Sequence, residues 1–154
     1  MGSSYSISCK VCDYSKNFKV GIGMMYSPSN LLDFDNEFAL IPNLIRSKKS
    51  VSYIKKLVEE KNVVIADNYR HAIYHCPKCS EFYERFFIHL DYENGSFEVE
   101  YKCTKCKTVL ETIGNDINLT DYWGKKDISL EKYKCPRCGN FSLFEGLGLM
   151  IMWD

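Results

Sequence analysis

The sequence Cys76-Pro77-Lys78-Cys79 is one of four copies of the same spacing in this chain of 154 residues. In each copy, two residues separate two cysteines, and the other copies occupy residues 9–12, 103–106 and 135–138. All eight cysteines belong to these four pairs. A secreted disulfide scaffold has no need for one repeated spacing, and disulfides are rare in reducing compartments. The pairs therefore indicate a metal-binding protein, which we expect in the cytoplasm.

The Cys-x-x-Cys spacing lets the backbone wrap around one metal ion, with amide groups directed at the sulfurs. Four thiolates at about 2.3 Å form a closed tetrahedral site that suits Zn²⁺ and leaves no position for a reacting water. Such zinc contributes roughly 10–16 kcal/mol in peptides, against about 5–15 kcal/mol for the stability of a whole domain. We therefore predict two structural Zn²⁺ ions and a chain that misfolds without them. The eight predicted ligands are Cys9, Cys12, Cys76, Cys79, Cys103, Cys106, Cys135 and Cys138.

Two of these knuckles, Cys76-Pro77-Lys78-Cys79 and Cys135-Pro136-Arg137-Cys138-Gly139, resemble those of zinc ribbons and rubredoxin-like folds. The resemblance covers the knuckles and the strands beside them, and it implies a metal site and a local fold. Iron bound by the same four cysteines is an alternative that the resemblance leaves open. The first three knuckles lack the glycine that often follows the second cysteine, so we expect less ideal turns there. The residues in its place are Asp13, Ser80 and Lys107.

The knuckles can pair in two ways. In the sequential pairing, residues 9–12 join residues 76–79, and residues 103–106 join residues 135–138. In the nested pairing, residues 76–79 join residues 103–106, and the first knuckle joins the last. We favour the sequential pairing, because it gives each site its own flanking strands and does not require distant ends of the chain to meet.

The rest of the chain predicts an α+β fold. Val51, Ile54, Leu57 and Val58 recur at helical spacing and indicate a helix over residues 50–61. The Asn94-Gly95 dipeptide lies between alternating segments at 82–90 and 96–102, which is typical of a hairpin. We expect two zinc-ribbon modules of short antiparallel strands with the helix inserted between the first two knuckles. The whole chain, 1–154, would form a single compact unit with sub-modules 5–80 and 81–154.

Charge limits the classes of function. Twenty basic and twenty acidic residues give a net charge of zero, and two zinc ions with eight thiolates would lower it to about −4. This balance argues against nucleic-acid binding through bulk charge. No apolar run is long enough to span a membrane. The three histidines, His71, His75 and His89, are expected to be surface or hydrogen-bonded residues, not ligands.

No catalytic triad, phosphate-binding loop or open metal site stands out, so we expect a protein that is not an enzyme and has no small-molecule substrate. We predict a cytoplasmic adaptor that uses zinc for its shape and binds another protein, with no membrane contact. The alternative is a nucleic-acid-binding zinc-ribbon accessory protein in transcription or RNA processing, favoured by the lysines around the knuckles. A third possibility is an enzyme whose site lies in residues 27–66. The apolar tail at residues 147–153 is expected to be a core strand or an edge for a partner.

Overall fold

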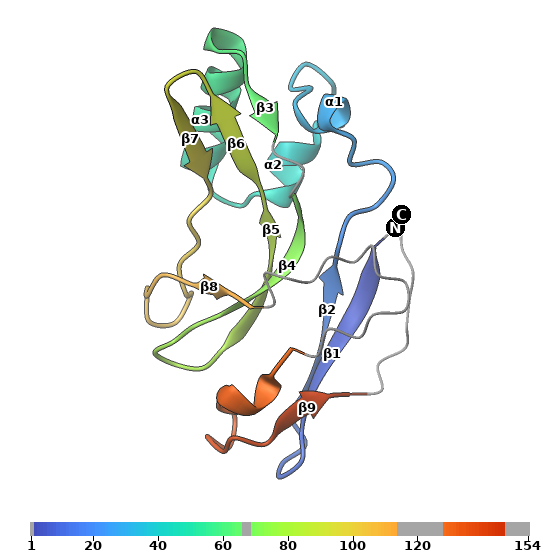
Figure 1. Ribbon diagram of the computed structural model, residues 1–154, viewed down its shortest axis with the longest axis vertical. Helices are drawn as coiled ribbons and strands as arrows, with labels where there is room; N and C mark the ends of the chain where they lie inside the picture. The colour runs from blue at the N-terminus through green and yellow to red at the C-terminus, as the bar shows by residue number, and fades with distance from the viewer. Residues whose placement is uncertain (1, 66–68, 114–127, 147–154) are drawn as a thin grey trace.

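The computed structural model describes residues 2–65, 69–113 and 128–146, and it shows an α+β protein (Figure 1). Its sheets are three small antiparallel ones, and three helices gather at one end of the elongated molecule. The fold class predicted from the sequence is therefore confirmed. The tail at residues 147–153 lies outside the described residues.

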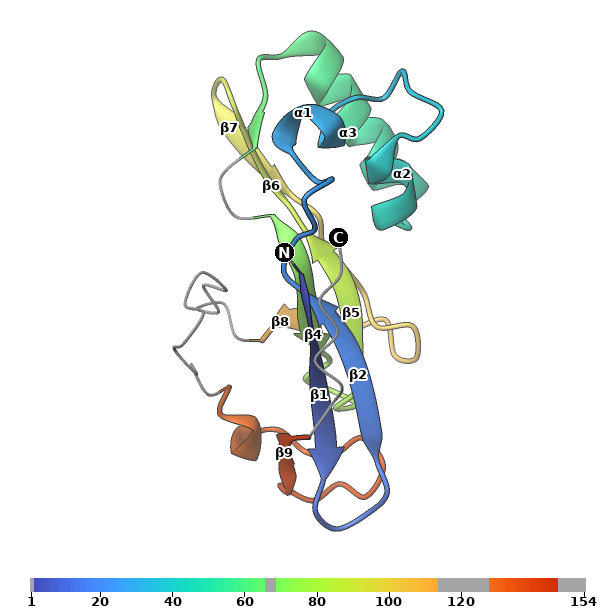
Figure 2. The same cartoon turned by 90° about the vertical axis from the view of Figure 1, so that its right-hand side faces the viewer.

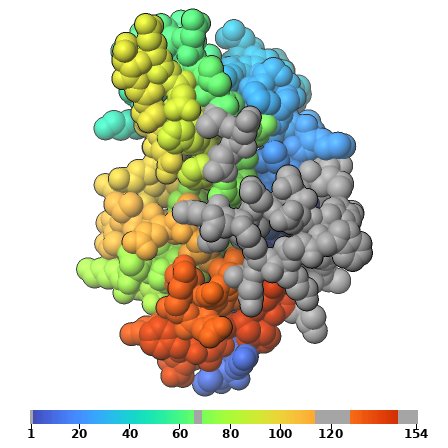
Figure 3. All heavy atoms as spheres, viewed as in Figure 1, coloured from blue at the N-terminus to red at the C-terminus, as the bar shows by residue number. Residues whose placement is uncertain are grey.

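The two ends of the described chain form one ribbon, which we call the outer ribbon. Strands β1 (Ser3–Cys9) and β2 (Ser15–Val20) make a hairpin whose tip is the first knuckle. Strand β9 (Leu143–Glu145) follows the fourth knuckle and pairs with the other edge of β1, so that Cys9 lies opposite Leu143. In the space-filling view, these blue and red segments together form the lower end of the molecule (Figure 3).

A second ribbon, the inner ribbon, repeats this arrangement in the middle of the chain. Strands β4 (Arg70–His75) and β5 (Phe82–Phe87) form a hairpin with the second knuckle at its tip. Strand β8 (Glu111–Thr112) follows the third knuckle and pairs with β4. The strand predicted over residues 82–90 is interrupted at Ile88, whose side chain is fully buried. Beyond it, the chain enters a different sheet.

That third sheet contains β3 (Val64–Ile65), β6 (His89–Tyr92) and β7 (Gly95–Glu98) in the order β3-β6-β7. The predicted Asn94-Gly95 hairpin is confirmed: β6 and β7 pair with Tyr92 opposite Gly95. Asn94 has a φ of 67°, the left-handed conformation that asparagine tolerates in tight turns.

The predicted helix over residues 50–61 is also confirmed, as α3 (Lys48–Glu60). Ser47 begins it, because its Oγ accepts a hydrogen bond from the Ser50 amide, 3.2 Å away. Ile54 and Leu57 on one face are buried, while Lys55 and Lys56 on the other pair with glutamates one turn later. Two shorter helices, α1 (Pro28–Leu31) and α2 (Leu40–Leu44), precede α3, and a 3₁₀ turn, η1 (Leu130–Lys132), precedes the last knuckle.

The two ribbons share one core, which fixes their relative position. Phe18 of β2 and Ile7 of β1 belong to the same buried cluster as Ile73 and Phe82 of the inner ribbon. Figure 2 shows the β1–β2 hairpin lying in front of the inner ribbon, and β2 contacts β4 and β5. Gly21 and His71 exchange two backbone hydrogen bonds of 3.0 and 2.8 Å.

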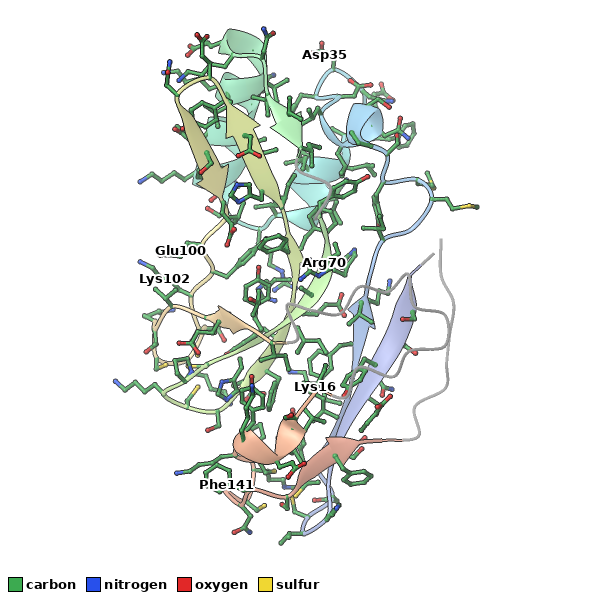
Figure 4. All side chains as sticks on the ribbon, viewed as in Figure 1. Lys16, Asp35, Arg70, Glu100, Lys102 and Phe141 are labelled. Carbon is green, nitrogen blue, oxygen red and sulfur yellow. The ribbon has the colours of Figure 1, made fainter. Side chains whose placement is uncertain are left out.

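Lys16 adds a polar link between the ribbons (Figure 4). Its Nζ donates to the Phe82 carbonyl at 2.7 Å and lies 3.6 Å from a carboxylate oxygen of Glu81. Glu81 also accepts a 2.6 Å hydrogen bond from Lys105 in the third knuckle. Backbone bonds, a shared core and this carboxylate therefore join the ribbons as one packed body.

A second buried cluster connects α3 with the third sheet and the inner knuckles. We predict that Ile54→Ala lowers the free energy of unfolding by about 2–5 kcal/mol, because Ile54 is fully buried. Chemical denaturation of the metal-loaded protein would measure this loss. The control Lys55→Ala removes one exposed ion pair and should change stability by less than about 0.5 kcal/mol. A similar effect of both substitutions would contradict the packing of α3.

Candidate metal centres

The eight cysteines form two groups of four, and the groups follow the nested pairing. The outer site contains Cys9, Cys12, Cys135 and Cys138, and the inner site contains Cys76, Cys79, Cys103 and Cys106. Within each group, the sulfur atoms all lie within 4.8 Å of one another. All eight residues predicted as ligands are thus brought together, and each group could hold one metal ion.

The sequential pairing that we favoured from the sequence was wrong. Pairing of β9 with β1 brings the last knuckle beside the first, and β8 with β4 does the same for the inner pair. The entropy of closing a loop grows only logarithmically with its length, so a meeting of distant segments is not a large obstacle. The division into sub-modules 5–80 and 81–154 assumed that each sub-module contains all four ligands of one site. In the nested pairing, each site takes two cysteines from each of these two ranges.

The sulfur positions fit a tetrahedral ion. The closest pairs across the outer site are 3.7 Å for Cys9–Cys138 and 3.6 Å for Cys12–Cys135. Both close pairs across the inner site are 3.4 Å apart. A disulfide would bring two sulfurs to about 2.05 Å, whereas a tetrahedron with 2.3 Å metal–sulfur bonds has edges of about 3.8 Å. The geometry is therefore compatible with two four-thiolate metal sites.

The knuckles share a backbone geometry that directs the sulfurs inward. In all four, the amide of the first cysteine donates to the carbonyl five residues later, at 2.8–3.0 Å. In three of them, the residue after the second cysteine is left-handed, with φ of 61° at Ser80, 63° at Lys107 and 73° at Gly139. The amide of each of these three donates to the carbonyl of the first cysteine.

Our expectation of poorer turns without glycine is therefore wrong at Ser80 and Lys107. Both residues adopt the left-handed conformation, which costs an L-amino acid about 1–2 kcal/mol. Asp13, which holds the same position in the first knuckle, is not among the described residues with positive φ. The first knuckle therefore differs from the other three.

Hydroxyl and amide groups around the sulfurs complete each site. In the outer site, Ser142 Oγ lies 3.0 Å from Cys9 Sγ, and Asn140 Nδ2 donates to Cys138 Sγ at 3.5 Å. In the inner site, Tyr83 Oη lies 3.2 Å from Cys103 Sγ, and Thr108 Oγ1 lies 3.3 Å from Cys106 Sγ. Hydrogen bonds to a thiolate stabilise its charge. Sequence analysis missed these residues, although Thr108 and Asn140 both stand two positions after a second cysteine.

The thiols of each site have widely separated pKa values. The hydrogen bond with Ser142 lowers the pKa of Cys9 to about 6, although burial opposes it. Burial raises the pKa of Cys103, but the Tyr83 hydroxyl and nearby amides outweigh it and bring the value to about 6.

Two other thiols shift in the opposite direction. A backbone bond from Tyr14 lowers the pKa of Cys12, but burial and the neighbouring thiols raise it to about 12. Burial raises the pKa of Cys79, also to about 12, with the neighbouring thiols adding to it. Crowding therefore keeps some thiols protonated until a cation replaces the protons, so metal binding should release protons and weaken as the pH falls.

His75 stands next to a ligand but belongs to neither group of four. Of the two expected settings, surface or hydrogen-bonded, the first is wrong for His75: it is buried, with its ring 5.0 Å from that of Phe82 and 4.7 Å from that of Tyr133. Its Nε2 has no hydrogen-bond partner among the described residues. Burial lowers its pKa, so His75 is neutral at pH 7 and fills the space between the two ribbons.

The nested pairing can be tested with two double variants. Cys12→Ser with Cys138→Ser removes ligands from the outer site only, so the purified protein should keep one metal ion per chain. Cys12→Ser with Cys79→Ser damages both sites and should leave none. Elemental analysis gives the metal content directly. The opposite result, with two ions lost in the first variant and one kept in the second, would restore the sequential pairing.

The left-handed residues generate a second prediction. Ser80→Gly should raise the free energy of unfolding of the metal-loaded protein by about 1 kcal/mol, because glycine adopts positive φ without a steric penalty. Asp13→Gly should instead lower it by about 0.5–1 kcal/mol, since position 13 gains no relief and the unfolded chain gains freedom. Chemical denaturation measures both changes. Equal effects of the two substitutions would mean that the knuckles do not differ in this way.

Among the described residues, no helix has both the length and the apolar character needed to cross a membrane. Comparison of the chain with protein-family models, curated proteins and solved structures gives no match. The resemblance to zinc ribbons and rubredoxin-like folds therefore stands on two groups of four cysteines in Cys-x-x-Cys knuckles, an arrangement compatible with zinc.

Proposed function

We propose that the protein is a non-enzymatic adaptor in which two zinc ions fix the shape of the ribbons and a groove at the helical end binds a segment of another protein. The observation that carries this proposal is an open groove of about 1040 Å³. Its walls are α3 with the residues just before it, β7, and the segment that leads from β7 into the third knuckle. Figure 4 shows Glu100 and Lys102 on that last segment.

The inner metal site supports one wall of the groove. Thr104, which lines the groove, lies between the ligands Cys103 and Cys106. Tyr101, another lining residue, donates a 2.6 Å hydrogen bond from its buried hydroxyl to the Phe86 carbonyl. A metal ion that fixes the third knuckle would therefore also fix this wall. Zinc suits this purely structural use, because it has no redox chemistry and favours closed tetrahedral sulfur sites.

The chemistry of the groove supports binding and not catalysis. The described residues that line it include no histidine, cysteine or aspartate. Four-thiolate sites have no open coordination position at which a metal-bound water could react. The groove does offer aromatic rings and two arginines, which are groups enriched where proteins recognise one another.

A second candidate function, nucleic-acid binding, is favoured by the surface at the tip of the outer ribbon. Phe141 is 60% exposed and Phe144 is 36% exposed. Lys134 Nζ lies 5.5 Å from the centre of the Phe141 ring, and Lys10 Nζ lies 5.9 Å from that of Phe144. Exposed rings beside lysines can stack on bases and pair with phosphates. We rank this candidate second, because the chain has no net positive charge.

The adaptor proposal predicts that a bulky residue in the groove blocks partner binding. The partner would be captured with the tagged metal-loaded protein in cells that produce it, then purified and titrated. Ser52 is exposed on α3 and lines the groove. We expect Ser52→Trp to weaken binding at least tenfold and Lys55→Trp, outside the groove, to leave it unchanged, with two zinc ions in each variant. Binding of a purified partner that both variants keep would refute this use of the groove.

Nucleic acid would reveal itself in the same preparations. Excess absorbance at 260 nm, and oligonucleotide binding that weakens with salt and with Phe141→Ala, would replace the adaptor proposal with the second candidate.

A further inference from the structure

The charges that line the groove are unequally matched. Five basic side chains line it, but only two acidic ones do. Lys56 lies 3.9 Å from Glu60, and Lys102 lies 3.8 Å from Glu100, so both have carboxylate neighbours. Among the described residues, Arg46, Lys49 and Arg85 form no ion pair. The groove therefore holds three cations whose charge no carboxylate of the described chain balances through a direct contact.

Arg85 is the cation most firmly held in place. It is half-buried on β5, donates from Nη1 to the Glu84 carbonyl at 2.7 Å, and stacks 5.0 Å from the centre of the Tyr83 ring. Burial lowers the pKa of Arg85, and the positive charge of Arg46 lowers it further. Both guanidinium groups line the groove, and their like charges repel each other. An anion between them would relieve this repulsion, and a carboxylate matches the planar fork of arginine.

Aromatic rings lie beside these cations. The Tyr53 ring on α3 and the Phe97 ring on β7 are 4.8 Å apart, and both line the groove. Tyr53 is 41% exposed, so its ring is accessible to a ligand. A large apolar side chain placed against these rings would be removed from water, which favours binding.

The acidic residues of the groove decide between a peptide and a nucleic acid. Glu98 and Glu100 lie on the wall formed by β7 and the segment after it. A nucleic-acid backbone carries a phosphate at every nucleotide and gains most from a continuous run of positive charge, which these two carboxylates interrupt. A peptide can place carboxylates near Arg46 and Arg85 and uncharged residues near the glutamates.

We infer that this groove binds an acidic peptide segment that contains one large apolar side chain, with Arg46 and Arg85 pairing with its carboxylates. The inference rests on the proposed adaptor function and names the chemistry of the partner. Lys49, in the first turn of α3, adds a third positive charge to the groove.

The probe for this inference is a library of random 12-residue peptides displayed on phage and selected on the metal-loaded protein. We expect selected peptides to be enriched in aspartate and glutamate around one aromatic or large aliphatic residue. Arg46→Glu and Lys49→Glu should each weaken their binding at least tenfold. Lys48→Glu is the matched control, because it makes the same charge change at the start of α3 on an exposed residue outside the groove. Metal content and circular dichroism confirm that each variant is folded.

A charge exchange makes the test independent of any loss of stability. Peptides in which lysine replaces the acidic residues should bind Arg46→Glu more tightly than they bind the unmodified protein. Selected peptides without acidic enrichment, or with equal affinity for Arg46→Glu and Lys48→Glu, would overturn the inference. A single-stranded oligonucleotide that competes for the groove more strongly than the peptides would also overturn it. If the cellular partner is still blocked by Ser52→Trp in those cases, the adaptor function survives and only the acidic partner is rejected.

Discussion

The meeting of the first and last knuckles at the outer site is the constraint on which the rest of the structure depends. Its sulfurs come from residues as far apart in sequence as Cys9 and Cys138, separated by 129 positions. The inner ribbon, the helices α1–α3 and the third sheet all lie between β2 and β9 in the sequence, so they form an insertion within the outer ribbon. Zinc in such a site contributes roughly 10–16 kcal/mol, far more than the few kcal/mol needed to close even a long loop. One ion can therefore offset the entropy of joining the two ends of the described chain.

The metal alone does not determine how the ribbons lie against each other. A four-thiolate site fixes two knuckles, but the strands that leave them could diverge. The buried cluster around Phe18 and Phe82 prevents this, because it contains residues from both ribbons. The inner ribbon in turn supports the helical end, since the core under α3 includes Cys76 and Cys103. Metal, shared core and groove thus form a connected series of contacts from one end of the molecule to the other.

Local signals in the sequence predicted local structure well. The Cys-x-x-Cys spacing, the apolar periodicity around Ile54 and the Asn94-Gly95 turn each depend on neighbours in the chain, so the knuckles, α3 and the β6–β7 hairpin could be predicted. The pairing of the knuckles could not, because it depends on β9 meeting β1 across the whole fold. The buried position of His75 and the sheet change at Ile88 likewise follow from packing between ribbons. The groove also could not be predicted, since Arg46 and Arg85 are far apart in sequence and line the same groove only in the folded chain.

The nested arrangement has a consequence for synthesis on the ribosome. When Cys79 has emerged, the chain contains two knuckles, residues 9–12 and 76–79, which belong to different sites in the finished protein. The correct partner of the second knuckle is complete only at Cys106, which is roughly 1–5 s later at ordinary translation rates. The correct partner of the first arrives later still. A metal ion that meets the chain during that interval would find four thiolates that belong to two different sites, so this arrangement favours late metal loading.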